Sequence, residues 1–405
     1  MAALAFAPSL SPETPVLRDD AEALEAAEAL AAWLLTGASE RDRLGTVPYE
    51  ALRRLAASGL LGITVPKSHG GARVTAETVV RVFAILAAAD PAIAQVPQNH
   101  FCFVESIVVD GTGPQKDFFF PKFLMGARLG NALSERGTKG VLNFETRLQR
   151  GADGVLRLNG TKYYCTGALT ADFIPAFAID DEQHLVIAYI DRHAEGVTAE
   201  EDWHAMGQRA TISGTVRFVD VVVPDDRVLP YWRHYEAPQA SGAFGQIIHA
   251  AIEVGIARGA LAEAAEFIRT KTRPWFESGL DRVADEPVVI HRFGELEVKT
   301  RAAEQLLFEA GRAIDRAWAD LDADTAAEAS LAVAAAKAFG GDVVLEVTNE
   351  IFSFAGSSAA DDRFNLHRHW RNARTHTLHD PNRWKYHHLG NFALNGVRPP
   401  NHGLV

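Results

Sequence analysis

Cysteine and positive charge are both scarce in this chain of 405 residues, and each scarcity argues against a class of protein. The two cysteines, Cys102 and Cys165, are too few for a disulfide framework and lack zinc-site spacing, which suits a reducing cytosol. Lysine and arginine number 40 against 52 aspartates and glutamates, so the formal net charge is -12. That balance disfavours a general affinity for nucleic acid or anionic membranes, and leaves room only for a local basic pocket.

Long apolar runs are also missing. No stretch approaches the roughly 20 apolar residues that span a bilayer, and the start of the chain, MAALAFAPSLSPET, lacks the basic region of a signal peptide. We therefore expect a cytoplasmic protein without a membrane partner. The composition itself is globular, with 47% hydrophobic and 23% charged residues, and the chain is long enough for two or three domains.

Hydrophobic periodicity divides the chain into three parts. Residues 1–125 carry helical patterns, including a helix over 21–37 with Gly37 as its C-cap and another with Thr75 as its N-cap. Residues 126–232 carry strand patterns, with turns predicted at 152–154 and at the Asn-Gly pair 159–160. Residues 233–405 return to long amphipathic helices, the first of which runs to Arg273 before a proline. This order predicts an α+β, mainly α protein with a helical bundle at its C-terminal end.

Five short motifs follow one another along the chain. They are VPKSHGG (65–71), NALSERG (131–137), NGTKYYCTGALTADF (159–173), WHAMGQRATISGTVRFVDVVVP (203–224) and TRPWF (272–276). In this order they resemble motifs of the acyl-CoA dehydrogenase superfamily over nearly the whole chain. The resemblance implies that fold: an N-terminal helical domain, a small central β-barrel or sandwich, and a C-terminal four-helix bundle.

The stretch RNARTHTLHDP (371–381) holds the residues on which the expected chemistry depends. Acyl-CoA dehydrogenases have a proton-abstracting Glu in the corresponding segment, and Asp380 lies at that position, one methylene shorter. The stretch more closely resembles a branch of reduced-flavin-dependent monooxygenases, the dibenzothiophene monooxygenase and SfnB-like sulfur-acquisition type, in which two histidines face the flavin. The resemblance implies that His379 is the leading acid or base and that His376 supports it.

Such enzymes receive reduced FMN from a separate NAD(P)H:flavin reductase, and O₂ converts it to a flavin C4a-(hydro)peroxide. Protecting that species requires a dry pocket and aimed donors. A histidine suits this task because its pKa lies near neutrality, whereas a carboxylate would repel the peroxide. The resemblance further implies site roles for His100 and Asn131, and a substrate that is an organosulfur or other small apolar or aromatic compound.

The resemblance also implies which residues hold the cofactor. The ring would lie against Asn131, Leu133, Ser134, Cys165 and Thr166, and the phosphate against Arg273, Phe276, Ser357 and Ser358. Features on the adenine side of the superfamily's FAD site are missing, which favours FMN over FAD. Because relatives share the phosphate site between subunits, a homotetramer is expected.

Two other functions remain open. One is a dehydrogenase or a nitroalkane-oxidase-like enzyme that uses Asp380 as its base together with FAD, and the other is a flavin-binding relative without catalysis. The site residues also have structural alternatives: His379 could bind the carbonyls of a helix end, His100 could be a core histidine, and Asp380 could pair with an arginine. No metal site is predicted, because the histidines near the C-terminus lack helical ligand spacing with a third ligand nearby.

Overall fold

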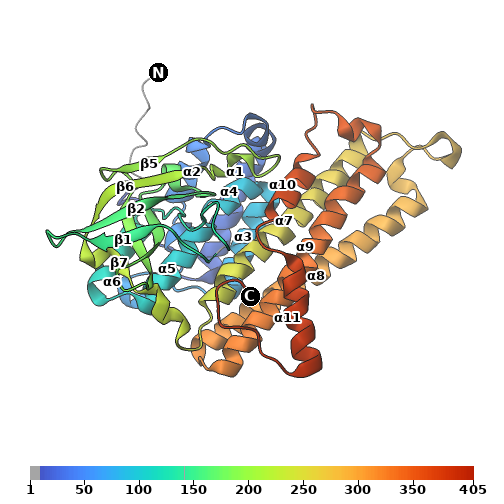
Figure 1. Cartoon of the computed structure of the whole chain (residues 1–405). Coiled ribbons are helices and arrows are strands. Elements are labelled where there is room, and N and C mark those ends of the chain that lie inside the picture. The colour runs from blue at the N-terminus through green and yellow to red at the C-terminus, as the bar shows by residue number, and fades with distance from the viewer. Residues whose placement is uncertain (1–9, 141) are drawn as a thin grey trace, which may run out of the picture.

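A computed structural model describes residues 10–140 and 142–405 of the chain. Figure 1 shows a sheet on one side of the molecule and long helices on the other, with shorter helices between them. The predicted α+β, mainly α architecture is confirmed. Among the described residues, no helix combines the length and the apolar character that a bilayer crossing requires.

The N-terminal part is helical throughout. Its helices are α1 (Asp20–Leu44), α2 (Tyr49–Ala57), α3 (Ala76–Ala89), α4 (Pro91–Gln95), α5 (Gln98–Asp110) and α6 (Gly113–Leu124). Thr75 caps α3 as predicted, because its side chain accepts a hydrogen bond from the backbone of Thr78. The prediction that Gly37 ends α1 was wrong. The helix continues to bury Ala38 and Asp42, and it ends at Gly45 in the left-handed conformation.

The central part forms one sheet of seven strands in the order β5-β6-β2-β1-β3-β4-β7. The strands are β1 (Arg147–Arg150), β2 (Leu156–Lys162), β3 (Phe173–Ile179), β4 (Leu185–Asp191), β5 (Val197–Ala199), β6 (Val216–Val223) and β7 (Val228–Leu229). The turn predicted at 152–154 joins β1 to β2. The turn predicted at Asn159-Gly160 was wrong, because both residues lie inside β2 at a register shift against β6. Gly160 is needed there for a close approach, since a Cβ would lie 2.2 Å from the Thr146 hydroxyl oxygen.

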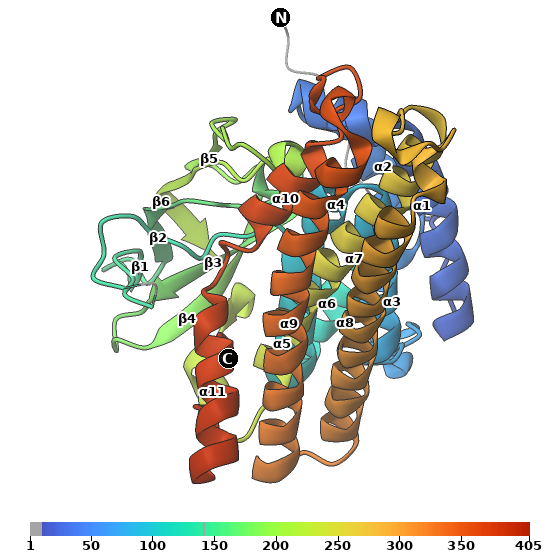
Figure 2. The same cartoon turned by 90° about the vertical axis from the view of Figure 1, so that its right-hand side faces the viewer.

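The C-terminal part contains α7 (Ser241–Thr270), α8 (Pro287–Ala319), α9 (Ala323–Ala355), α10 (Arg368–His376) and α11 (Asn382–Asn395). Figure 2 shows α7, α8 and α9 side by side, with α11 alongside α9. Helix α7 ends at Thr270, three residues before the predicted Arg273.

The helices of the two ends share one hydrophobic core. Helix α3 packs against α7 and α8, and buried residues from all three belong to the same cluster. Glycines on α7 allow this contact, because a Cβ at Gly255 or Gly259 would lie 2.6 or 2.2 Å from a backbone oxygen of α3. The N-terminal helices therefore complete the bundle that the C-terminal helices begin.

Candidate functional site

A cluster of titratable side chains, all of them buried except His379, lies where α7, α9, α10 and α11 meet. It comprises His249 and Glu253 from α7, Lys337 from α9, His376 at the end of α10, His379 and Asp380 in the following turn, and Lys385 from α11. The two predicted histidines, His376 and His379, are thus brought to one place, together with a third that was not predicted.

His376 is buried and held from both sides. Its Nδ1 lies 3.0 Å from Oε1 of Glu253, and its Nε2 lies 3.3 Å from Nδ1 of His249. A carboxylate only accepts, so Nδ1 of His376 carries the proton in the neutral ring and Nε2 accepts from His249. Burial lowers the pKa of His376, and the Glu253 carboxylate opposes that effect without overcoming it. His376 is therefore neutral in the folded chain near pH 7.

His379 forms the accessible end of the cluster. Its ring stacks on His249 with centroids 3.8 Å apart, and its Nδ1 lies 3.0 Å from Oδ1 of Asp380. The side chain of His379 is 42% exposed, whereas those of His249 and Asp380 are buried. Since Nδ1 donates to the carboxylate, the neutral ring keeps a lone pair on Nε2 for a partner outside the cluster.

Asp380 is surrounded by cations. Lys385 Nζ lies 2.9 Å from its Oδ2, and Lys337 Nζ lies 3.9 Å from its Oδ1. Burial alone would raise the pKa of Asp380, but the His379 hydrogen bond and the two lysine charges outweigh it and hold the pKa well below its ordinary value. A carboxylate with such a lowered pKa is a weak base, so this environment disfavours proton abstraction by Asp380.

The C-terminal segment ends against this cluster. Lys385 also donates to the Gln246 side chain at 3.2 Å and to the backbone oxygen of Leu404 at 2.7 Å. The last residue, Val405, is buried. The end of the chain therefore helps to cover the ion pair of Lys385 and Asp380.

A second group of predicted residues lies beside the sheet, around the loop that follows β2. The Thr166 hydroxyl lies 2.7 Å from that of Ser213, which lies 2.8 Å from that of Thr211, and Thr211 donates to the backbone oxygen of Gln208. Because the terminal carbonyl can only accept, the chain of donors runs from Thr166 toward Gln208. The oxygen of Thr166 consequently retains acceptor capacity.

The amide side chains of Asn131 and Gln208, near these hydroxyls, contain buried atoms without hydrogen-bond partners. Oδ1 of Asn131 is buried with no hydrogen bond, while its Nδ2 donates weakly to the Tyr164 backbone oxygen at 3.4 Å. Both polar side-chain atoms of the buried Gln208 are also without a hydrogen bond. Buried polar atoms without partners are costly, so such a pair indicates a place for a polar ligand or water.

The backbone around these amides is strained. Tyr164, Gln208 and Ile212 all have positive φ, at 58°, 51° and 48°. Positive φ is rare for a β-branched residue such as Ile212. Strain of this kind is retained where surrounding structure enforces it, and it clusters at ligand sites.

The other residues predicted to contact the ring act here through the backbone. The amide of Cys165 donates to the Gly214 oxygen at 2.9 Å, and burial raises the pKa of its thiol to about 12. The carbonyl of Leu133 accepts from Lys162, and that of Ser134 accepts from the Tyr163 amide. Cys165 is therefore a buried, unreactive thiol in the loop after β2.

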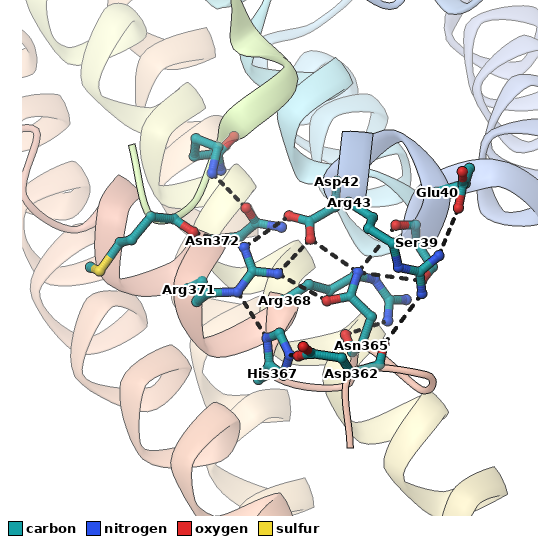
Figure 3. Close-up of polar contacts among 12 residues, drawn as sticks. Ser39, Glu40, Asp42, Arg43, Asp362, Asn365, His367, Arg368, Arg371 and Asn372 are labelled. Atoms are coloured by element: carbon teal, nitrogen blue, oxygen red, sulfur yellow. Dashed lines mark hydrogen bonds and ion pairs between the residues drawn. The ribbon is translucent and has the colours of Figure 1, made fainter. Parts of the chain in front are cut away.

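Helix α10 connects the histidine cluster to the residues beside the sheet, and Figure 3 shows the contacts that its residues Arg371 and Asn372 make. The side-chain oxygen of Asn372 accepts a hydrogen bond from the backbone N–H of Gln208 at 2.6 Å. Asn372 lies one helical turn before His376. Beside it, Arg371 forms an ion pair with Asp42 of α1 and donates to the Met206 backbone at 2.7 Å. The RNAR stretch thus fastens the bundle to both other parts of the chain.

His100 lies apart in a structural setting. Its Nε2 is 2.8 Å from the backbone oxygen of Leu61, and its Nδ1 accepts from the Leu129 amide at 3.2 Å. Burial lowers its pKa to about 4. Both ring nitrogens serve the backbone, which is the arrangement of a core histidine, and the site role of His100 stays a prediction.

The four residues predicted to hold the phosphate lie together at one end of the bundle. Thr272, next to Arg273, donates to the backbone oxygen of Ala355, just before the turn that holds Ser357 and Ser358. Arg273, both serines and Phe276 are exposed, with Phe276 at 78%. Figure 1 shows the loop between α7 and α8 at the far right, on the side away from the sheet.

Four members of the cluster were missed by the sequence analysis: His249, Glu253, Lys337 and Lys385. A signal for three of them was present. His249 and Glu253 stand four residues apart in IIHAAIEVGIA, and Lys337 is the single charge in AVAAAKAFGG. Ionisable residues within otherwise apolar helical stretches are buried only where they find partners.

No group of three or more histidine, cysteine or acidic side chains with metal-binding geometry occurs within residues 10–140 and 142–405. The arrangement instead offers an accessible imidazole backed by a carboxylate, and buried polar atoms without partners beside the sheet.

The chain is similar to known proteins over most of its length. Residues 18–127, 131–221 and 247–384 match the N-terminal, middle and C-terminal domains of acyl-CoA dehydrogenase. The dibenzothiophene monooxygenase of Rhodococcus erythropolis is 32% identical over 96% of this chain and 98% of its own length. A Pseudomonas putida protein named "Probable FMNH2-dependent monooxygenase SfnC" is also 32% identical, over 95% and 98%.

The fold agrees with that similarity. The FMN-bound crystal structure of TdsC from Paenibacillus sp. A11-2 superposes with a TM-score of 0.90 at 30% identity, covering 95% of this chain and all of that one. The chain therefore belongs to the acyl-CoA dehydrogenase family and, within it, to the branch of flavin-dependent monooxygenases.

Proposed function

We propose that the protein is a two-component monooxygenase that uses reduced FMN and O₂ to oxygenate an organosulfur compound or another small apolar or aromatic molecule. The observation that carries this proposal is the His379–Asp380 pair. The accessible group is an imidazole, and the carboxylate behind it is held as an anion by two lysines. Such a pair moves a proton at Nε2 of His379, as oxygen transfer requires.

The residues beside the sheet fit FMN. When bound, reduced flavin supplies the electrons and reacts with O₂. The unpartnered Oδ1 of Asn131 and the acceptor oxygen of Thr166 suit a reduced ring, whose NH groups donate. The two relatives are named for FMNH₂ dependence and for bound FMN, which supports FMN over FAD.

Each residue of the histidine cluster has a task in this proposal. Asp380 fixes the tautomer and orientation of His379, so that Nε2 faces outward as base or, when protonated, as donor. His249 covers one face of that ring and excludes water from it. His376 remains neutral and supports His249 from behind.

Two copies of the chain would complete the cofactor site. Arg273, Ser357 and Ser358 lie on the side of the bundle away from the sheet, and Arg273 has no ion pair or hydrogen bond with any described residue. The adjacent Trp275 and Phe276 are 64% and 78% exposed, which suits burial against another subunit. We infer a homotetramer in which these residues reach the phosphate of a neighbour's FMN.

The separate NAD(P)H:flavin reductase follows from the same reasoning. A monooxygenase that consumes reduced flavin needs a source of it, and the relative from Pseudomonas putida is named for that dependence. The substrate class rests on the names of the relatives as well. Dibenzothiophene is therefore the first compound to test.

The alternative function, that of a dehydrogenase or oxidase, requires Asp380 to abstract a proton. Its lowered pKa and its contacts with His379, Lys337 and Lys385 oppose that task. A flavin-binding protein without catalysis would have no need of an outward-facing His379.

The proposal is tested by substituting both residues of the pair. The flavin-reconstituted enzyme would be supplied with a flavin reductase, NADH, O₂ and dibenzothiophene, and product and H₂O₂ would be measured per NADH consumed. We expect His379→Ala to lower the product yield at least tenfold and to raise H₂O₂ correspondingly. Asp380→Asn should reduce the yield less, because the imidazole remains.

A matched control is His184→Ala, since His184 is a similarly exposed histidine, at 37%, stacked on Trp232 beside the sheet. Its yield should equal that of the wild type. If Asp380→Asn abolished turnover while His379→Ala did not, and if butyryl-CoA or nitroethane bleached the oxidised flavin, the proposed function would be wrong.

A further inference from the structure

The buried carboxylates and ammonium groups of the cluster are equal in number. Two carboxylates, Glu253 and Asp380, face two ammonium groups, Lys337 and Lys385. Lys337 is completely buried and lies between the carboxylates, 2.5 Å from Glu253 and 3.9 Å from Asp380. A further charge in this space would lack a counter-charge, and burial makes such an imbalance costly.

The three histidines connect the two carboxylates. Glu253 accepts from Nδ1 of His376, His376 accepts on Nε2 from Nδ1 of His249, and the His249 ring stacks on His379. Asp380 accepts from Nδ1 of His379 at the other end. Each proton position along this path follows from a terminal carboxylate that can only accept.

We propose that the buried ion pair of Glu253 and Lys337 positions this path and sets the charge state of His379. Neither residue reaches the exposed part of the site, so both act through His376, His249 and Asp380. The pair fixes the tautomer of His376. The positive charge of Lys337 disfavours protonation of the stacked rings of His249 and His379. The consequence for catalysis rests on the proposed function, whereas the electrostatic coupling does not.

The ion pairs and ring contacts around His379 in the described part of the chain come from four elements. Lys337 comes from α9, Glu253 and His249 from α7, His376 from α10, and Asp380 and Lys385 from the turn after α10 and from α11. Burial lowers the pKa of His249 and of His376, and the Lys337 charge lowers both further, while Glu253 opposes this at His376 without overcoming it. Burial would raise the pKa of Glu253, but Lys337 and His376 outweigh it, so this carboxylate is an anion.

The coupling is measurable on the full-length chain without flavin or substrate. Diethyl pyrocarbonate acylates unprotonated imidazole, so its rate at His379, followed by peptide mass spectrometry between pH 5 and 9, reports the charge state of that ring. Glu253→Gln removes a negative charge and should move the midpoint of this profile down by about one pH unit. Lys337→Met removes a positive charge and should move it up by a similar amount.

The double variant Glu253→Gln/Lys337→Met restores the charge balance, so its midpoint should return to the wild-type value. His184 in the same samples is the internal control, and its profile should be unchanged in every variant. Coincident profiles for the wild type and both single variants would overturn the inference, as would shifts of both in the same direction. Thermal unfolding of each variant shows that the measurement is made on folded protein.

A second measurement needs no variant, which matters if a single variant fails to fold. Nitrogen-15 chemical shifts of histidine distinguish a protonated Nδ1 from a protonated Nε2. We expect His376 to carry its proton on Nδ1, and a proton on Nε2 would contradict the proposed path. If the midpoints shift as expected while His379→Ala leaves the product yield unchanged, the coupling stands and the proposed function fails. If the midpoints do not shift while His379→Ala lowers the product yield, the proposed function stands and the coupling fails.

Discussion

At the scale of single residues, the sequence predicted best those site residues that stand close together in one motif. His376 and His379 were predicted from RTHTLHDP and lie together in the structure. Glu253 was not predicted, because it lies 123 residues away from the His376 it contacts. A motif records spacing along the chain, but a buried ion pair between two helices depends on how those helices pack.

Gly207 gives a prediction at this scale. A Cβ at this position would lie 2.0 Å from the backbone oxygen of Arg371. Gly207→Ala must push α10 away from the middle part, and we expect a loss of about 2 kcal/mol or more in the free energy of unfolding. Urea denaturation followed by circular dichroism measures it.

The control for that substitution is Gly294→Ala on α8, where nothing lies within 4 Å of the added carbon. It should stabilise the chain by about 0.5–1 kcal/mol through the helix propensity of alanine. If both substitutions changed the free energy of unfolding equally, the close approach at Gly207 would not contribute to stability.

At the scale of elements, the boundaries that local chemistry determines were predicted, and those that tertiary contacts determine were not. Thr75 caps α3 through its own hydroxyl, and local signals suffice for that. Gly37 does not end α1, because buried contacts continue to Asp42. The Asn159-Gly160 pair forms no turn, because the glycine is required against Thr146 and the pairing with β6 continues past it.

The loop between α7 and α8 allows a test of the proposed phosphate site. Arg273→Gln removes the charge but keeps a polar side chain, so we expect the affinity for FMN to fall about tenfold, as the loss of one charge-assisted bond implies. Riboflavin, which lacks the phosphate, should bind both forms equally. Flavin fluorescence quenching measures both affinities.

Arg282→Gln is the matched control, because Arg282 lies in the same loop and only pairs with Asp285 at 3.9 Å. Its affinity for FMN should be unchanged. A loss of riboflavin binding in Arg273→Gln would mean that the substitution disturbs the fold of the loop, and would count against a phosphate role.

At the scale of the whole molecule, buried neutral histidines make stability depend on pH. His100, His249 and His376 all have folded-state pKa values below the unfolded value near 6.5. Between the two values the unfolded chain binds more protons, so stability falls as the pH drops below 6.5. With its pKa at about 4, His100 alone accounts for about 2 kcal/mol lost by pH 5.

Urea denaturation at pH 8, 7, 6, 5 and 4 checks this expectation. The decline should begin near pH 6.5, before ordinary carboxylates titrate, and should steepen further below the unfolded values of Glu253 and Glu263, whose folded pKa values are also lowered. A stability that stayed constant between pH 7 and 5 would show that the buried histidines protonate without cost.

The packing of α3 against α7 and α8 also has a bearing on synthesis. The ribosome releases α3 together with α1, which also packs on it, yet α7 and α8 arrive only after residue 241. During that interval the surface of α3 that α7 and α8 bury in the folded chain has no permanent cover. The nascent polypeptide is therefore exposed to self-association until the last long helices emerge, and a chaperone has its greatest opportunity in that period.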